Sequence, residues 1–142
     1  MMAGEVYGVE IWGVYSVADW WRLTAGYNAL HEDFRFKPGS LNVPGLEAAA
    51  NDPSYQFSLR SSMNLGSDWE LDMGLRGVGA LPHPSVPSYV TLDARIGWRI
   101  LDNLEISLAG FNLLDETHPE FGAAPTRGEL RRSFALNTRW TF

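Results

Sequence analysis

The chain has 142 residues, a formal net charge of -6 and 45% hydrophobic residues. Its length is that of one domain, and the acidic balance argues against a nucleic-acid-binding surface. The absence of cysteine excludes disulfide scaffolds and thiolate metal sites. No segment approaches the ~20 apolar residues that a membrane-spanning helix requires. The first residues also lack the basic and apolar regions of a signal peptide.

Apolar and polar residues alternate through most of the chain, which is the period of a β-strand with one apolar and one polar face. The alternation is least regular in the first run, where Trp12 and Val14 share a face with Glu10. No helical period lies between the runs. In chain order the predicted strands are 4–15, 20–28, 55–65, 69–77, 89–100, 104–111 and 131–142.

The predicted connections alternate between short and long. The short ones are 17–19, 66–68 and 101–103, and the long ones, rich in proline, glycine and charge, are about 31–53, 80–88 and 115–128. Tight turns at one end of a meander and long loops at the other are typical of outer-membrane β-barrels. The turn at 101–103 predicts that Ile100 pairs with Leu104, Arg99 with Glu105 and Trp98 with Ile106.

Alternating strands also occur in soluble sandwiches and lipocalin-like barrels, but further details favour a membrane barrel. Strands of about ten residues match a tilted bilayer crossing of ~9–11 residues. The polar faces are rich in arginine and carboxylate, whereas lysine occurs only at position 37. Aromatic residues gather near strand ends, as in interfacial girdles: Trp20, Trp21, Trp69, Trp98, Tyr27, Tyr55 and Tyr89. The predicted fold is an all-β, antiparallel up-and-down meander of about seven strands, a segment of a transmembrane β-barrel.

Two segments carry a resemblance to a known family. GFNLLDETHPEFG (110–122) and PTRGELRRSFALNTRWTF (125–142) resemble the C-terminal end of TonB-dependent outer-membrane receptors. In that family an Asn-Leu-Leu-Asp turn, often followed by His-Pro-Glu-Phe, precedes a final strand that closes on aromatic-x-aromatic. The preceding residues, 89–108, look like the family's previous pair of strands. The resemblance implies that residues 1–142 form a C-terminal barrel segment, without a plug domain or signal peptide.

The resemblance also implies a function and partners. The expected location is the bacterial outer membrane, and the expected role is uptake of a scarce ligand such as a ferric siderophore or cobalamin. Expected partners are outer-membrane lipid, the barrel-assembly machinery and, only through the missing plug region, the TonB system. In the family the final strand is an assembly signal, here Phe134, Leu136, Trp140 and Phe142. The alternative is a small self-contained structural barrel with no transport role, which a further strand before Glu5 or within 41–50 would favour.

Catalysis, a cofactor and a metal site are not predicted. His31, His83 and His118 fall in the predicted long loops, where His and carboxylate side chains suit transition metals. Ordinary loop histidines are the favoured interpretation. Ser85 lies near His83 without a nucleophile elbow. Carboxylates on the polar faces are expected to balance arginines there: Glu70, Asp72 and Asp93 against Arg60, Arg76, Arg95 and Arg99.

The best candidates for ligand contact are aromatic and cationic residues of the long loops, which suit anionic or catecholate ligands. A loop aromatic more often packs against its own loop, which is the alternative interpretation. The candidates are Phe34, Phe36, Pro38, His118, Phe121 and Arg127.

Overall fold

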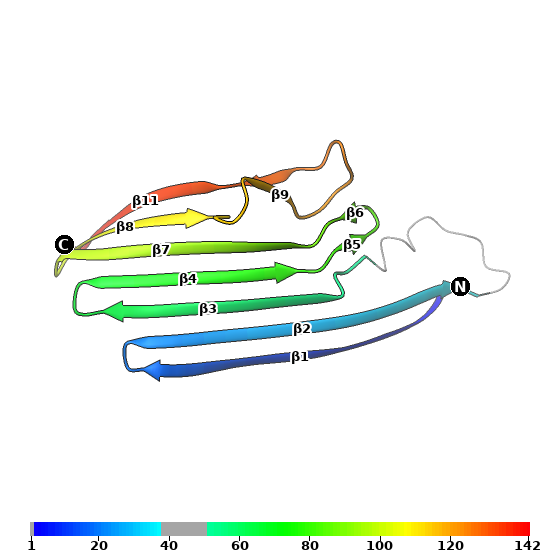
Figure 1. Ribbon diagram of the computed structural model, residues 1–142, viewed down its shortest axis with the longest axis horizontal. Coiled ribbons are helices and arrows are strands. Elements are labelled where there is room, and N and C mark those ends of the chain that lie inside the picture. The colour runs from blue at the N-terminus through cyan, green and yellow to red at the C-terminus, as the bar shows by residue number, and fades with distance from the viewer. Residues whose placement is uncertain (1, 38–50) are drawn as a thin grey trace.

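The structure is a computed structural model that describes residues 2–37 and 51–142. Its main feature is a seven-stranded antiparallel sheet in the order β1-β2-β3-β4-β7-β8-β11 (Figure 1). The strands are β1 Met2–Ala18, β2 Trp21–Phe36, β3 Tyr55–Leu65, β4 Trp69–Val78, β7 Tyr89–Leu101, β8 Leu104–Phe111 and β11 Ser133–Trp140. The predicted all-β meander of seven strands is confirmed. Within the described ranges, the chain contains no helix long and apolar enough to span a membrane.

Short strands lie in or beside two of the predicted loops. β5 (Leu81–Pro82) pairs with β6 (Ser85–Val86) within one loop. β9 (Thr117–Pro119) pairs with β10 (Glu129–Arg131), which follows the other loop and includes Arg131 from the predicted final strand. The first predicted loop also begins later than expected, because β2 continues to Phe36 and takes His31 and Phe34 with it. Residues 41–50, where a further strand would favour a self-contained barrel, lie outside the described residues.

The turn between β7 and β8 corrects one predicted pairing. Arg99 lies opposite Glu105 and Trp98 opposite Ile106, as predicted, but Leu101 rather than Ile100 pairs with Leu104. The register shifts between Arg99 and Leu101. Such an irregularity places one extra residue in one strand, as a β-bulge does, so that the chain turns over two residues instead of three.

The register collects the two kinds of side chain on opposite faces of the sheet. One row crosses six strands and is entirely apolar: Trp21, Met63, Leu71, Ile96, Leu108 and Leu136. The adjacent row on the other face begins Arg22, Ser62, Asp72 and Arg95. A single alternation therefore continues from β2 to β11, whereas on β1 the apolar Trp12 and Val14 lie in rows of the polar face.

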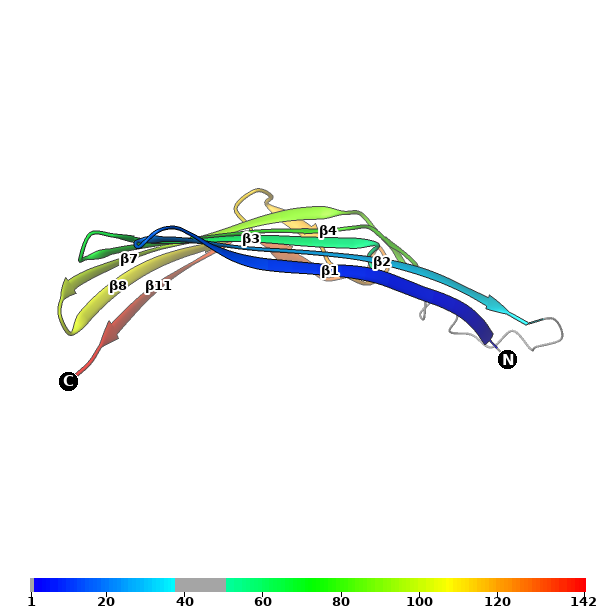
Figure 2. The same cartoon turned by 90° about the horizontal axis from the view of Figure 1, so that it is seen from below.

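Burial on these faces is the reverse of that in a soluble protein. On β8, Leu108 of the apolar face is 49% exposed, whereas Glu105 and Ser107 of the polar face are 8% and 6% exposed. The sheet is curved (Figure 2), and side chains on the inner side of a curved sheet converge and shield one another. The polar face is therefore the inner face, and the apolar face is the outer face.

Candidate functional site

The inner face carries a network of ion pairs centred on Arg95 of β7. Its Nη1 lies 3.1 Å from Glu70 Oε2 and 3.4 Å from Asp72 Oδ2, and its Nη2 pairs with Glu105. Arg139 Nη2 of β11 lies 2.7 Å from the second oxygen of Glu105. The predicted balance of inner-face charges is thus confirmed for Arg95 with Glu70 and Asp72. The network joins β4, β7, β8 and β11.

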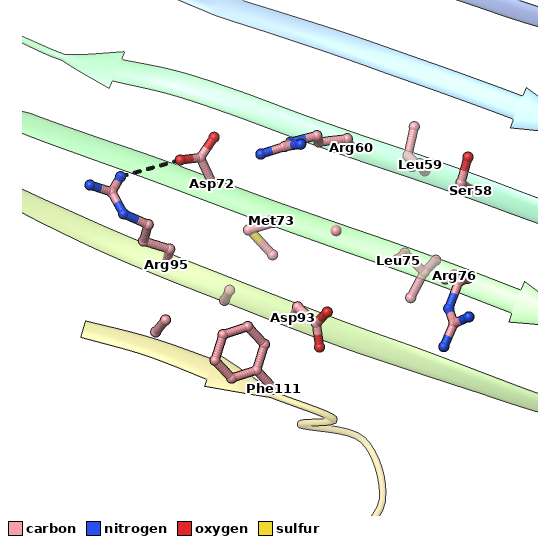
Figure 3. A pocket seen from close by; sticks show the side chains of 13 residues that line it. Ser58, Leu59, Arg60, Asp72, Met73, Leu75, Arg76, Asp93, Arg95 and Phe111 are labelled. Atoms are coloured by element: carbon pink, nitrogen blue, oxygen red, sulfur yellow. Dashed lines mark hydrogen bonds and ion pairs between the residues drawn. The ribbon is translucent and has the colours of Figure 1, made fainter. Parts of the chain in front are cut away.

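A hollow of about 410 Å³ lies beside this network, and its inner-face lining includes Arg60, Asp93 and Phe111 (Figure 3). Gly74 also lines it, and a Cβ at Gly74 would meet no heavy atom within 4 Å. Asp93 Oδ1 accepts a hydrogen bond from the Asn112 backbone N–H at 2.9 Å. Guanidinium groups beside an aromatic ring suit an anionic or aromatic group.

A second cluster fastens the β9–β10 hairpin to the sheet. His118 of β9 is 5% exposed, and its ring centroid lies 4.5 Å from that of Tyr89. His118 Nε2 lies 3.3 Å from Glu120 Oε1, which also pairs with Arg76 of β4. The Arg76 Cζ atom lies 5.4 Å from the centre of the Tyr89 ring. These residues, Arg76, Tyr89, His118 and Glu120, are called the hairpin clamp below.

Charge in the hairpin clamp favours an ionised Glu120. Burial by itself raises the pKa of this carboxyl, but hydrogen bonds from His118 and Arg76, together with the charge of Arg76, lower the pKa below its ordinary value. Glu120 therefore remains an acceptor for Arg76 at neutral pH.

Asn112 holds the base of the same hairpin. Its φ of 53° is left-handed, a conformation that Asn tolerates better than most residues. Its side-chain Nδ2 donates to the Leu130 carbonyl at 3.3 Å, and the Arg132 backbone N–H donates to the Glu116 carbonyl at 2.9 Å. Within the described part of the chain, the buried atoms Asn112 Oδ1 and His118 Nδ1 have no hydrogen-bond partner.

The predicted ligand-contact residues are not brought together. Phe34 lies in β2 directly opposite Gly4, and a Cβ on Gly4 would lie 2.3 Å from its ring. Phe36 is the last residue of β2, and Pro38 lies outside the described residues. His118 is buried in β9 rather than exposed in a loop, whereas Phe121 at the hairpin tip is 68% exposed.

Arg127 also belongs to the hairpin tip, where its Cβ would lie 3.2 Å from a Cβ added to Gly122. Ligand contact by any of these residues stays a prediction. Sequence reasoning missed the roles of Glu120 and Tyr89. The His-Pro-Glu motif was the available signal, but its partners Arg76 and Tyr89 are distant in sequence. Among the described residues, no group of three or more His, Asp or Glu could hold a metal ion.

The predicted assembly-signal residues lie on the outer face of β11 or directly beyond it. Phe134, Leu136 and Trp140 are 67%, 72% and 67% exposed. Phe142 follows the strand and is also exposed. Their side chains are therefore accessible to a partner, and the assembly role itself stays a prediction.

No protein-family model and no curated protein matches the sequence. Several solved structures do resemble the chain. The closed form of the ferric-catecholate import receptor Fiu from E. coli K12 is 23% identical with a TM-score of 0.77, over 98% of this chain and 21% of that receptor. Its open form gives 21% identity and a TM-score of 0.73, over 96% and 21%. The pyoverdine outer membrane receptor FpvA from Pseudomonas aeruginosa is 25% identical with a TM-score of 0.64, over 99% and 22%.

The chain thus spans about a fifth of the length of the receptors it resembles. The likeness covers nearly the whole chain, including the meander of long strands. It confirms the predicted fold, an antiparallel meander like a segment of the β-barrel of these receptors. The similar structures are transport receptors rather than enzymes.

Proposed function

We propose that the chain forms part of the wall of a β-barrel in the bacterial outer membrane, with its apolar face toward lipid and its polar face toward the barrel interior. The exposed apolar face carries this proposal. Among the described residues, only Val78, Val86 and Ala109 are buried hydrophobics, while Ile96, Leu108 and Leu136 of one row are 43%, 49% and 72% exposed. In water such a face would be a large exposed apolar patch, whereas in a bilayer lipid tails would cover it.

The receptor containing this wall is proposed to import a scarce ligand, such as a ferric siderophore or cobalamin, with energy from the TonB system. The support is the likeness to a ferric-catecholate import receptor and a pyoverdine receptor. The guanidinium groups and Phe111 ring at the inner hollow are compatible with an anionic, aromatic ligand. The chain itself contributes wall and loops, and the TonB system would act on the receptor through a plug region.

Tryptophan fluorescence in lipid tests the membrane orientation. Trp140 on the outer face is 67% exposed and Trp12 on the inner face is 75% exposed, so the two form a matched pair. In single-Trp variants reconstituted in bilayers, brominated lipid tails should quench Trp140 strongly and Trp12 weakly. Equal quenching would contradict a lipid-facing outer face.

Uptake by the full-length receptor tests the transport role. Cells that depend on this receptor should accumulate a radiolabelled ferric chelate, and loss of TonB should abolish accumulation. A chain that resides in the outer membrane as a complete barrel and supports no uptake would instead favour the self-contained structural barrel.

The outer-face residues of β11 are proposed as contacts for the barrel-assembly machinery, because Phe134, Leu136 and Trp140 are exposed at alternate positions along one strand. In β-augmentation, the partner protein recognises alternate side chains of the strand that is added to its sheet. Trp140→Ala should slow insertion of the receptor while leaving inserted barrels nearly as heat-resistant. Unchanged insertion with weakened finished barrels would contradict this role.

A further inference from the structure

We propose that Glu120 is a positioning residue whose protonation state controls the β9–β10 hairpin: ionised, it holds the hairpin on the inner face of the sheet, and protonated, it releases it. The clamp itself follows from contacts within this chain. Its consequence for ligand capture rests on the proposed function, because the hairpin tip carries Phe121 and Arg127.

The contacts of Glu120 join separate parts of the fold. Its carboxylate receives Arg76 from β4 and His118 from β9, and the His118 ring packs on Tyr89 of β7. The hairpin base is held to β7 separately, by the Asn112 N–H on Asp93 Oδ1 at 2.9 Å and by the Leu113 N–H on the Leu92 carbonyl at 2.8 Å. Beyond the base, Glu120 is the ionic link between the hairpin and β4, and its contact with His118 supports the ring packing on Tyr89 of β7.

The groups facing Glu120 determine what protonation does. They are Arg76 from β4, Tyr89 from β7 and His118 from β9. A neutral carboxyl loses its charge-assisted hydrogen bond with Arg76, which is roughly twice as strong as a neutral one. Among the described residues, the buried His118 Nδ1 has no partner that would compensate for this loss. The hairpin would then be held by its contacts at the base and by the packing of His118 on Tyr89, without an ionic link to β4.

The direction of the pKa change sets the pH range of release. The pKa of Glu120 is lowered by His118 and Arg76 against the opposing effect of burial. A lowered pKa in the folded state means that the contribution of Glu120 is fully present above the ordinary carboxyl range and is lost as the pH falls through the lowered value. The hairpin should stay closed at neutral pH and open only in acid.

Release of the hairpin would change which side chains are accessible on the inner face. Phe121 is next to Glu120 and is already 68% exposed, so it would move away from the wall together with the tip. His118, which is 5% exposed in the closed arrangement, would become accessible. Contact between His118 and a ligand would therefore require the open hairpin.

Spin labelling tests the clamp, and the absence of native cysteine makes a single label straightforward. A label at Ala123→Cys on the tip, in the full chain in detergent or lipid, reports tip mobility by electron paramagnetic resonance. Between about pH 7 and about pH 3 the label should become severalfold more mobile. Glu120→Gln should give the mobile spectrum already at pH 7, where the sheet is intact by circular dichroism.

Glu129→Gln on β10 is the matched control and should retain the pH-dependent spectrum, because Glu129 lies outside the clamp. Arg76→Gln should reproduce the mobile spectrum of Glu120→Gln at pH 7. An immobile tip in both clamp variants at pH 7 would overturn the proposal. If the receptor supports uptake but the mobility of the label does not change with pH, the clamp alone is refuted. If the mobility changes but the receptor supports no uptake, only the proposed function is refuted.

Discussion

Glycine and aromatic residues face each other across strand pairs at several places in the sheet. Gly4 lies opposite Phe34, Gly77 opposite Phe57 and Gly110 opposite Phe134. A Cβ added to these glycines would lie 2.3, 2.1 and 3.1 Å from the opposing ring. The rings therefore cover the glycine backbones, an arrangement that compensates for the missing side chain in a strand.

Substitution at Gly77 should displace the ring that covers it. Gly77→Ala should destabilise the folded state by about 1 kcal/mol, because the Phe57 ring must turn away and lose its cross-strand contact. Gly74→Ala in the same strand meets no atom within 4 Å and should be neutral or slightly stabilising. Reversible urea unfolding in lipid vesicles measures both. An equal cost for Gly77→Ala in a Phe57→Ala background would contradict the ring as its cause.

Substitution of Arg95 tests how much the ion-pair network of the inner face contributes to stability. Arg95→Gln removes the cation that Glu70, Asp72 and Glu105 share. Because Arg139 still pairs with the buried Glu105 and Arg99 with Glu70, the loss should be about 1–2 kcal/mol.

Arg60→Gln in β3, on the same face of the sheet, provides the matched control. Arg60 has no ion pair within the described part of the chain, so its replacement should change stability by at most about 0.5 kcal/mol. Unfolding in lipid compares the two variants. Similar losses would mean that the inner-face charges are interchangeable rather than organised around Arg95.

For the strands, the sequence predicts the features that depend on the alternation of apolar and polar residues. It does not predict those that depend on contacts between distant residues. Alternation identified all seven strands of the main sheet, because six of them have one apolar and one polar face and β1 follows the period in part. It placed the end of β2 too early, because the residues around His31 and Asp33 are polar on the face that is apolar in the rest of the strand. β9 has only three residues, too few for any period to be seen.

The two faces of β11 should respond differently to an added cation. Leu136→Arg places a charge among lipid tails and should cost ~2–4 kcal/mol near the bilayer midplane. Asn137→Arg, one residue later, points to the polar interior and should be mild. Folding free energies in bilayers give the comparison. Equal costs would remove the argument that the apolar rows face lipid.

For the whole molecule, the sequence predicted the wall but not the hairpin clamp. The clamp depends on Arg76 and Tyr89 meeting Glu120 across more than thirty positions of chain, and no local pattern marks such a meeting. The same is true of Asn112, whose contacts to Asp93 and Leu130 come from opposite sides in the sequence. Such long-range polar contacts can be predicted only after the strand register is known. The register itself follows from the alternation of apolar and polar residues.

The isolated chain should behave as an incomplete barrel. In the seven-stranded sheet, within the described residues, β1 and β11 each pair with only one neighbour, so each leaves a backbone edge open. Open edges pair with other chains, and unpaired backbone groups are not tolerated in lipid. The exposed outer face adds an apolar surface to both edges. In detergent-free buffer, sedimentation velocity should therefore show large, concentration-dependent assemblies, and detergent should reduce their size by covering the outer face. A monodisperse monomer without detergent would mean that the outer rows are compatible with water, which would count against the membrane wall itself.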